Sequence, residues 1–235
     1  MSNLPAVPAL DPARWCSLEP TTERERRVRA ILDVLAQRWP ARFELDARNA
    51  YEMLIATVLA ARTLDRLVNE RTKELFARYP DAAALAQAMP DEIEPLIQGV
   101  MSFRQKAKYL VQTAQQLVHE HGGQVPDRLD DLVQLPGVGR KTALMVLGTS
   151  FDRHEGIPVD THVHRVAQRL GLTATDDPEA IEAALLALVP PAERTATAQR
   201  LVLHGRYTCI ARKPACATCE IAQACPSRGH AEPHE

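Results

Sequence analysis

Four cysteines near the end of the chain place the tightest constraint on how it can fold. Cys209, Cys216, Cys219 and Cys225 follow the pattern C-x6-C-x2-C-x5-C. A loop this short buries little apolar surface, so a bound metal must supply its order. The spacing leaves zinc and an iron–sulfur cluster open, and four idle buried thiols are the alternative. The fifth cysteine, Cys16, stands apart and is interpreted as a free thiol.

The rest of the sequence predicts an all-α fold. Leu, Ala and Val are plentiful, aromatic residues make up only 4% of the 235 residues, and alternating runs of Val, Ile or Thr are nearly absent. The segment YEMLIATVLAA, residues 51–61, is apolar nearly all round and predicts a buried central helix. Further helices, separated by prolines, are predicted over residues 65–78, 82–88, 91–98, 104–121, 128–134, 140–150, 161–170, 178–188 and 193–204.

Three capping signals mark the starts of predicted helices. They are Thr22 with Glu25, Asn49 with Glu52, and Asp177 followed by Pro178. The helix that begins near Thr22 is predicted to end before Pro40. Residues 1–20 are aperiodic and dotted with prolines, so they are predicted to form a flexible N-terminal extension.

Net charge and hydropathy limit the classes of partner. The formal net charge is −2, so any nucleic-acid site must be a local patch. The sequence shows no charged-then-apolar leader and no apolar run long enough to span a bilayer. We therefore expect a cytoplasmic protein without membrane contact, in which the cysteines are metal ligands rather than disulfides. The absence of a heptad pattern favours a monomer.

The stretch LPGVGRKTA, residues 135–143, joins two predicted helices through two glycines. Glycine tolerates positive φ and leaves backbone N–H groups uncovered. Where such a turn leads into the N-terminus of a helix, those N–H groups bind phosphate, which is a sequence-independent grip on a DNA backbone. An ordinary helix–helix turn is the alternative. Because the basic pair Arg140 and Lys141 follows the glycines, the phosphate-binding turn and the ordinary turn are about equally favoured.

Lys141 is predicted in the first turn of the helix that follows, where the helix dipole is positive. That field disfavours the ammonium form, and partial burial would disfavour it further, which makes a neutral, nucleophilic amine more accessible. A neutral amine can attack an electrophilic sugar carbon and form a Schiff base. A solvated surface lysine is the alternative.

Asp160, in the stretch PVDTHVHRV, precedes a helical segment and is a natural N-cap. A carboxylate close to DNA phosphates is an odd choice for binding alone. Its functional interpretation is therefore stabilisation of a sugar cation, or proton transfer. A purely structural cap is the alternative.

These motifs, in this order, resemble the endonuclease III family of helix-hairpin-helix DNA glycosylases. The motifs that carry the resemblance are LPGVGRKTA, then VDTH at residues 159–162, then LHGRYTCIARKPACATC with its fourth cysteine, Cys225. The resemblance covers about Arg27 to Cys225 and implies a two-domain, all-α fold. It implies a six-helix barrel over residues 43–153, and a 4Fe–4S cluster domain built from residues 21–42 together with 154–235. The partner it implies is double-stranded DNA with damaged bases or abasic sites, and in a prokaryote the protein would be nucleoid-associated.

The resemblance also assigns roles to side chains. Lys141 is implied to be the nucleophile at C1′ of a flipped nucleotide, and Asp160 to assist base expulsion and the later proton steps. The four cysteines are implied to hold the 4Fe–4S cluster. The DNA-binding residues it implies are Arg62, Ser102, Gly137, Val138, Gly139, Arg140, His162, Arg212 and Lys213.

Three positions depart from the family pattern. Arg62 stands where a glutamine often fills the gap left by the flipped nucleotide, and arginine offers donors only. Ser102 stands where an apolar residue usually wedges into the base stack, with Met101 and Phe103 beside it. Val133 occupies a position that is often acidic. These departures bear on substrate range and rate rather than on the chemical class.

The sequence thus predicts a bifunctional DNA glycosylase and abasic-site lyase for oxidised pyrimidines in base excision repair. One alternative is a glycosylase of the same fold that acts on mismatched uracil or thymine. The other is a damage-binding protein with weak turnover, which Ser102 and Arg62 favour slightly.

Overall fold

The computed structural model describes residues 4–7 and 11–229, and these residues form helices joined by turns, with no strand among them. The all-α prediction is therefore confirmed. The chain divides into two compact units, Phe43–Glu155 and Met1–Arg42 with Gly156–Glu235. No helix in the described ranges has both the length and the apolar character needed to cross a membrane.

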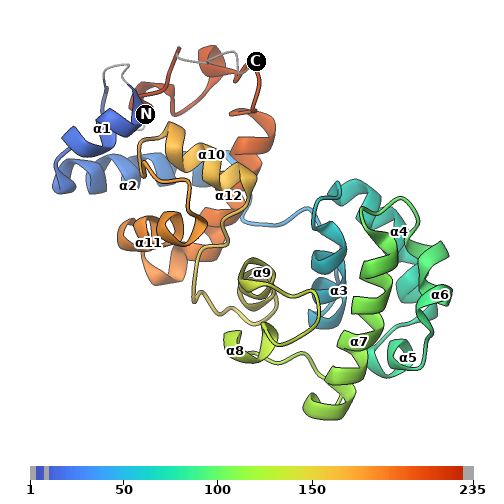
Figure 1. Ribbon diagram of the computed structural model, residues 1–235. Coiled ribbons are helices and arrows are strands. Elements are labelled where there is room, and N and C mark those ends of the chain that lie inside the picture. Colours follow the sequence, from blue (N-terminus) through green and yellow to red (C-terminus); the bar gives the residue numbers. More distant parts are fainter. Residues whose placement is uncertain (1–3, 8–10, 230–235) are drawn as a thin grey trace. The chain divides into compact units, whose positions relative to one another are not determined.

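The unit Phe43–Glu155 is built around one buried helix. Helix α3 is buried from Tyr51 to Leu59 and packs against α4, α7 and α9 (Figure 1). The predicted central helix is therefore confirmed. The elements of this unit are α3 (Ala50–Ala60), α4 (Asp65–Arg78), α5 (Ala82–Ala86), α6 (Pro90–Ile93), the 3₁₀ turn η1 (Glu94–Ile97), α7 (Phe103–His121), α8 (Leu129–Leu132) and α9 (Arg140–Ser150).

The second unit has a separate apolar core. Its helices are α1 (Pro12–Leu18), α2 (Thr21–Arg38), α10 (Thr161–Arg169), α11 (Pro178–Leu188) and α12 (Arg194–Tyr207), with 3₁₀ turns at Pro191–Glu193, Cys216–Thr218 and Ala222–Ala224. Helices α10 and α12 pack closely (Figure 1). A side chain at Gly205 of α12 would bring its Cβ to 2.9 Å from the Cβ of His162, so a glycine permits this approach.

Two of the three predicted capping signals are present. The Asn49 side chain accepts a hydrogen bond from the Glu52 N–H at 2.9 Å, although the Glu52 carboxylate accepts from the backbone of Arg48 rather than closing the box. Asp177 caps α11, with Pro178 as its first residue. The box at Thr22 is wrong, because α2 begins at Thr21 and has Pro20 at its N-cap position without a side-chain cap.

The N-terminal segment differs from its prediction. Residues 12–18 form helix α1, which Asp11 caps by accepting a hydrogen bond from the Arg14 N–H at 3.0 Å. The adjoining Glu19 carboxylate makes a paired hydrogen bond with Arg27 of α2, at 2.7 Å to Nε and 2.6 Å to Nη2. Arg27 Nη1 also donates to the carbonyls of Leu170 and Ala224, at 2.8 and 3.2 Å. Part of the predicted extension is therefore tied to the core of this unit.

Breaking the Glu19–Arg27 pair is expected to destabilise this unit strongly. The side chains of Arg27 and Glu19 are only 1% and 3% exposed, so Glu19→Gln leaves a buried guanidinium without a counter-charge. Removing one partner of such a buried pair costs about 3–5 kcal/mol. Urea denaturation should show an earlier unfolding transition in Glu19→Gln, and no shift in the control Glu25→Gln, whose side chain is exposed. An unchanged transition in Glu19→Gln would contradict a stabilising role for the pair.

Candidate functional site

The glycine turn between α8 and α9, residues 135–139, is held against the core by buried apolar side chains. Leu135 and Val138 are buried at 2% and 5% exposure. Gly137 has a φ of +76°, and a Cβ at this position would lie 2.8 Å from Cδ2 of Tyr109. Both the backbone conformation and the close ring therefore require glycine at this position. The Pro136 carbonyl accepts a hydrogen bond from Thr113 Oγ1 at 2.9 Å, which ties the turn to α7.

The turn leads directly into the N-terminus of α9. Gly139 is the N-cap residue and, in the part of the chain that the structure describes, no side chain caps the helix there. An uncapped helix start with exposed residues is a suitable anion site. Val138 is different from its neighbours, because its side chain is buried and its N–H donates to the Leu135 carbonyl at 3.1 Å. Val138 therefore supports the turn instead of offering a contact surface.

Lys141 is the second residue of α9, as predicted, and its side chain is exposed. The sequence interpretation included partial burial of this lysine, and the structure does not bear that out. What remains is the positive end of the helix dipole, which acts within the first turn of a helix. Arg140, the first residue of α9, is exposed as well.

Asp160 is the N-cap of α10, as predicted. Its Oδ1 atom accepts hydrogen bonds from the N–H groups of His162 and Val163, both at 2.8 Å. Its Oδ2 atom receives no hydrogen bond from any of the described residues. The carboxylate is half-buried, so one oxygen holds the helix while the other stays available for chemistry. Lys141 and Asp160 belong to different units of the chain.

His162 is the second residue of α10, two residues after Asp160. Burial lowers the pKa of His162, against the opposing effect of the Asp160 carboxylate. Its Nδ1 atom lies 3.2 Å from Nη2 of Arg165. A neutral imidazole at the start of α10 offers one donor and one acceptor rather than a positive charge.

Arg62 and Ser102 occupy two turns of the unit Phe43–Glu155. Both residues are exposed, and both have left-handed backbone conformations, with φ of +58° and +57°. Such conformations are uncommon for residues other than glycine and mark constrained turns. Val133, the third departure, is the C-cap residue of α8 and packs against the core.

The predicted basic loop follows α12. Arg212 and Lys213 are exposed, and Lys213 has a φ of +57°. Arg169 of α10 holds the loop in place, because its guanidinium donates to the carbonyls of Ile210 and Ala211 at 2.8 and 2.9 Å. Arg169 therefore fixes the backbone of the loop that carries the exposed side chains of Arg212 and Lys213.

All four predicted cysteine ligands line one pocket of the second unit. This pocket lies between α10, α12 and the 3₁₀ turns Cys216–Thr218 and Ala222–Ala224. The pocket contains about 480 Å³ of space not filled by protein atoms, part of it open to solvent. The Cys209 thiol accepts a hydrogen bond from Arg169 Nη1 at 3.4 Å, and the Cys225 thiol donates to the Arg169 carbonyl at 3.4 Å. This arrangement agrees with the sequence prediction that the four thiols converge.

Burial makes two of these thiols reluctant to ionise. It raises the pKa of Cys219 to about 11 and that of Cys225 to about 12. A metal binds the thiolate form of cysteine, and the bound cation offsets the free energy lost in burying that negative charge. A metal bound in this pocket would therefore have to supply the free energy of ionising these two thiols.

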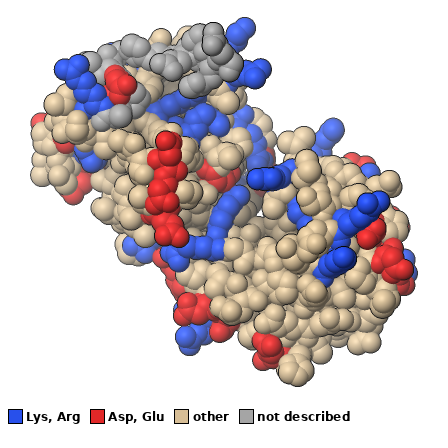
Figure 2. All heavy atoms as spheres, viewed as in Figure 1, with Lys and Arg blue, Asp and Glu red and all other residues tan. Residues whose placement is uncertain are grey.

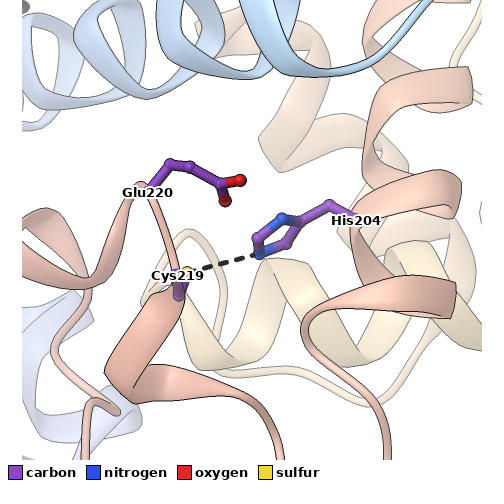
Figure 3. Close-up of side chains that lie close together, drawn as sticks. All are labelled: His204, Cys219 and Glu220. Atoms are coloured by element: carbon purple, nitrogen blue, oxygen red, sulfur yellow. Dashed lines mark hydrogen bonds between the residues drawn. The ribbon is translucent and has the colours of Figure 1, made fainter.

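A histidine and a glutamate beside Cys219 were not identified from the sequence. His204 Nε2 lies 3.9 Å from Cys219 Sγ (Figure 3), and ligand atoms of His204, Cys219 and Glu220 lie within 4.8 Å of one another. Burial lowers the pKa of His204 to about 4, and its Nδ1 has no hydrogen-bond partner in the described chain. His204 lies in the LHGRYTC stretch, and its spacing from Cys209 does not by itself predict a metal ligand. These residues form a group that could hold a metal ion.

Comparison with known proteins places this chain in a family. Residues 55–191 match the model of the HhH-GPD superfamily of base excision DNA repair proteins. The endonuclease III of Synechocystis sp. is 43% identical over 211 residues, which are 89% of this chain and 96% of the relative. The endonuclease III of Escherichia coli K12 is 38% identical over 182 residues, which are 77% of this chain and 86% of the relative.

Solved structures show the same similarity in three dimensions. A trapped endonuclease III–DNA covalent intermediate superposes with a TM-score of 0.82 at 38% identity, over 86% of this chain and 96% of that one. A thermostable thymine-DNA glycosylase gives a TM-score of 0.77 at 24% identity, over 89% and 99% of the two chains, which shows a shared fold. The chain thus belongs to the HhH-GPD superfamily of base excision DNA repair proteins, within which it is similar to endonuclease III.

Proposed function

We propose that this protein is a bifunctional DNA glycosylase and abasic-site lyase that removes oxidised pyrimidines through a lysine Schiff base. The observation that carries the proposal is the position of Lys141, exposed in the first turn of a helix that begins at an uncapped glycine turn. The similarity to endonuclease III over most of the chain supports it.

In the proposed reaction the unprotonated Lys141 Nζ forms a bond to C1′ of the damaged nucleotide. The N-glycosidic bond breaks, its electron pair leaves with the base, and the base takes up a proton. Opening of the sugar ring then gives a Schiff base between Nζ and C1′. Loss of a proton from C2′ expels the 3′ phosphate by β-elimination, and water finally releases the lysine.

Asp160 is proposed to serve the charged steps of this sequence. Its Oδ1 is committed to capping α10, whereas Oδ2 receives no hydrogen bond within the described chain. A carboxylate oxygen of this kind stabilises positive charge on the sugar as the base leaves, and then accepts or returns a proton during elimination.

The DNA contacts are proposed to come from backbone and side chains of both units. The uncapped start of α9, with Gly137, Gly139 and Arg140, would hold one phosphate, and Arg212 and Lys213 another. Figure 2 shows that Lys and Arg side chains lie on both units over the visible face, interspersed with Asp and Glu. Binding would thus use local basic groups rather than net charge, which is −2.

The four cysteines are proposed to hold a 4Fe–4S cluster. Four convergent thiols in one pocket match the ligand set of such a cluster, and a Cys₄ zinc site is the alternative. The cluster would supply structure, by tying the Arg212–Lys213 loop to α10 and α12. His204 would lie beside the cluster ligand Cys219 as a neutral imidazole.

Metal analysis of the purified protein tests this assignment. The expected result is a yellow-brown protein with about four irons per chain and a broad visible absorbance band. Cys219→Ser is expected to lower the iron content, whereas Cys16→Ser, outside the pocket, is expected to retain it. A colourless protein with about one zinc per chain would contradict the cluster assignment.

Product analysis on defined duplexes tests the proposed function. With an oxidised pyrimidine in the duplex, the expected products are a free damaged base and a strand with a β-elimination end. Release of the base without strand cleavage would indicate a monofunctional glycosylase. Tight binding without either product would indicate a damage-binding protein.

A further inference from the structure

Two turns of the unit Phe43–Glu155 are cross-linked by hydrogen bonds. The first, which we call the Arg62 turn, is residues 61–64 between α3 and α4. The second, the Ser102 turn, is residues 99–102 before α7. Both contain a non-glycine residue in the left-handed conformation, with φ of +58° at Arg62 and +57° at Ser102. Such conformations persist only where surrounding contacts hold them.

The Lys106 side chain holds the end of α3 and the start of the Arg62 turn. Its ammonium donates to the carbonyls of Leu59 and Ala61, at 2.8 and 2.6 Å, where α3 ends and the Arg62 turn begins. Its backbone N–H donates to the Ser102 carbonyl at 3.0 Å, which is the first backbone bond of α7 and does not depend on the side chain. The residue is only 7% exposed, and its positive charge lies at the negative end of the α3 dipole. A buried lysine with these partners fixes carbonyl positions rather than meeting solvent.

Thr63 supplies a second link. Its Oγ1 atom accepts a hydrogen bond from the Met101 N–H at 3.1 Å, which joins the two turns directly. Its own N–H donates to the Ala60 carbonyl at 3.0 Å. The Lys106 side chain thus restrains the Arg62 turn, and Thr63 in that turn carries the restraint to the Ser102 turn.

The side chains that these turns present are exposed and chemically distinct. Arg62 is exposed beside Leu64, which is 78% exposed, and Met101 is 55% exposed beside Ser102. Ser102 itself is too small to separate stacked bases, whereas a methionine is long, apolar and adaptable. The paired turns thus offer a cation and an apolar side chain held at a fixed separation.

We propose that Lys106 and Thr63 are positioning residues that lock the Arg62 turn and the Ser102 turn into one element, which presents Arg62 and Met101 to a damaged duplex. This inference rests on the proposed function only for the identity of the duplex. The locking itself is a property of the free protein. Lys106 acts through Arg62 and Met101 and touches no reacting atom.

Hydrogen exchange in the free protein tests the locking. Lys106→Met keeps an unbranched side chain, one atom shorter, and removes its charge and donors. Lys108→Met, two residues further along and exposed, is the matched control. Exchange measured on peptides covering residues 59–64 and 97–103 is expected to accelerate in both peptides in Lys106→Met and in neither in the control, because loosening the Arg62 turn also frees Thr63, the acceptor for the Met101 N–H. Acceleration confined to residues 59–64 would overturn the coupling. Thr63→Val, which removes the bond from the Met101 N–H and the 3.5 Å bond from Thr63 Oγ1 to the Ala61 carbonyl, should accelerate residues 97–103 if Lys106→Met fails to fold.

Single-turnover kinetics test the positioning. Base removal from a duplex needs extrusion of the nucleotide, whereas cleavage of a single-stranded abasic oligonucleotide does not. Lys106→Met is expected to slow the duplex reaction at least about tenfold and the single-stranded reaction less than about twofold, because misplaced positioning groups cost up to about 100-fold. Equal slowing of both reactions would overturn the positioning role. A parent protein that cleaves neither the duplex nor the single strand contradicts the proposed function instead, and in that case, or if only the single strand is left uncleaved, the exchange result decides the locking.

A double variant, Lys106→Met with Arg62→Ala, tests whether Lys106 acts on the duplex reaction through Arg62. If Lys106 acts through Arg62, then Lys106→Met should slow the duplex reaction of Arg62→Ala much less than it slows that of the parent. The same slowing in both backgrounds would overturn the proposal that Lys106 positions Arg62.

Discussion

Replacing Lys141 with glutamine is expected to abolish strand cleavage at abasic sites while DNA binding persists. Removing a nucleophile costs at least about 10³-fold in turnover, since no other amine replaces it. Glutamine is polar and only one atom shorter than lysine, and Lys141 is exposed, so the fold should not change. Affinity for an abasic duplex should fall by no more than about tenfold, because at most one phosphate contact is lost. The measurements are single-turnover cleavage and equilibrium binding at one fixed salt concentration.

The control for this variant is Lys108→Gln, an exposed lysine on α7 of the same unit, which should cleave at the parent rate. If Lys141→Gln cleaved abasic DNA within a few-fold of the parent rate, the nucleophile would be another group. If cleavage and affinity fell together by the same factor, Lys141 would be a phosphate-binding residue at the start of α9.

Changing Asp160 to asparagine is expected to lower turnover by about 10²–10⁴-fold, the range for removing a group that moves protons. The substitution isolates the charge, because an asparagine side-chain oxygen still accepts the hydrogen bonds from the His162 and Val163 N–H groups. The thermal midpoint of Asp160→Asn should therefore stay close to that of the parent. Turnover and affinity of the damaged duplex are measured separately.

Asp160→Ala is the matched comparison, because it removes the charge and the cap together. It should lose about 1 kcal/mol of stability in addition to turnover. Parent-like turnover in Asp160→Asn, combined with a loss in Asp160→Ala, would reduce Asp160 to a helix cap. Equal losses of turnover and affinity in Asp160→Asn would make it a binding residue.

Features governed by local rules were predictable from the sequence. Asp177 with Pro178 starts α11, and Asp160 caps α10, because short polar side chains accept from the first N–H groups of a helix wherever they precede one. Gly137 was recognisable as a turn residue, although its contact with Tyr109 of α7 depends on tertiary packing that spacing does not encode.

Features governed by long-range contacts were not predictable. Helix α1 is a single short segment whose stability comes from tertiary contacts such as the Glu19–Arg27 pair, so its proline-rich sequence resembled an irregular extension. Lys106 lies in an amphipathic helix among other charged residues, and only folding brings it to the carbonyls of α3, about 45 residues earlier. His204 became a candidate only because α12 brings it to Cys219.

The central claim is that Lys141 Nζ forms a covalent bond to C1′ of the damaged nucleotide, and borohydride reduction followed by peptide mapping tests it most directly. Reduction traps the Schiff base on abasic DNA, and nuclease digestion leaves a sugar remnant on the attacking amine. Since trypsin does not cleave after a modified lysine, the account predicts the remnant on the peptide of residues 141–153, which begins after Arg140 and ends at Arg153. A remnant on any other amine, or no trapped adduct with a parent protein that binds the abasic duplex, would contradict it.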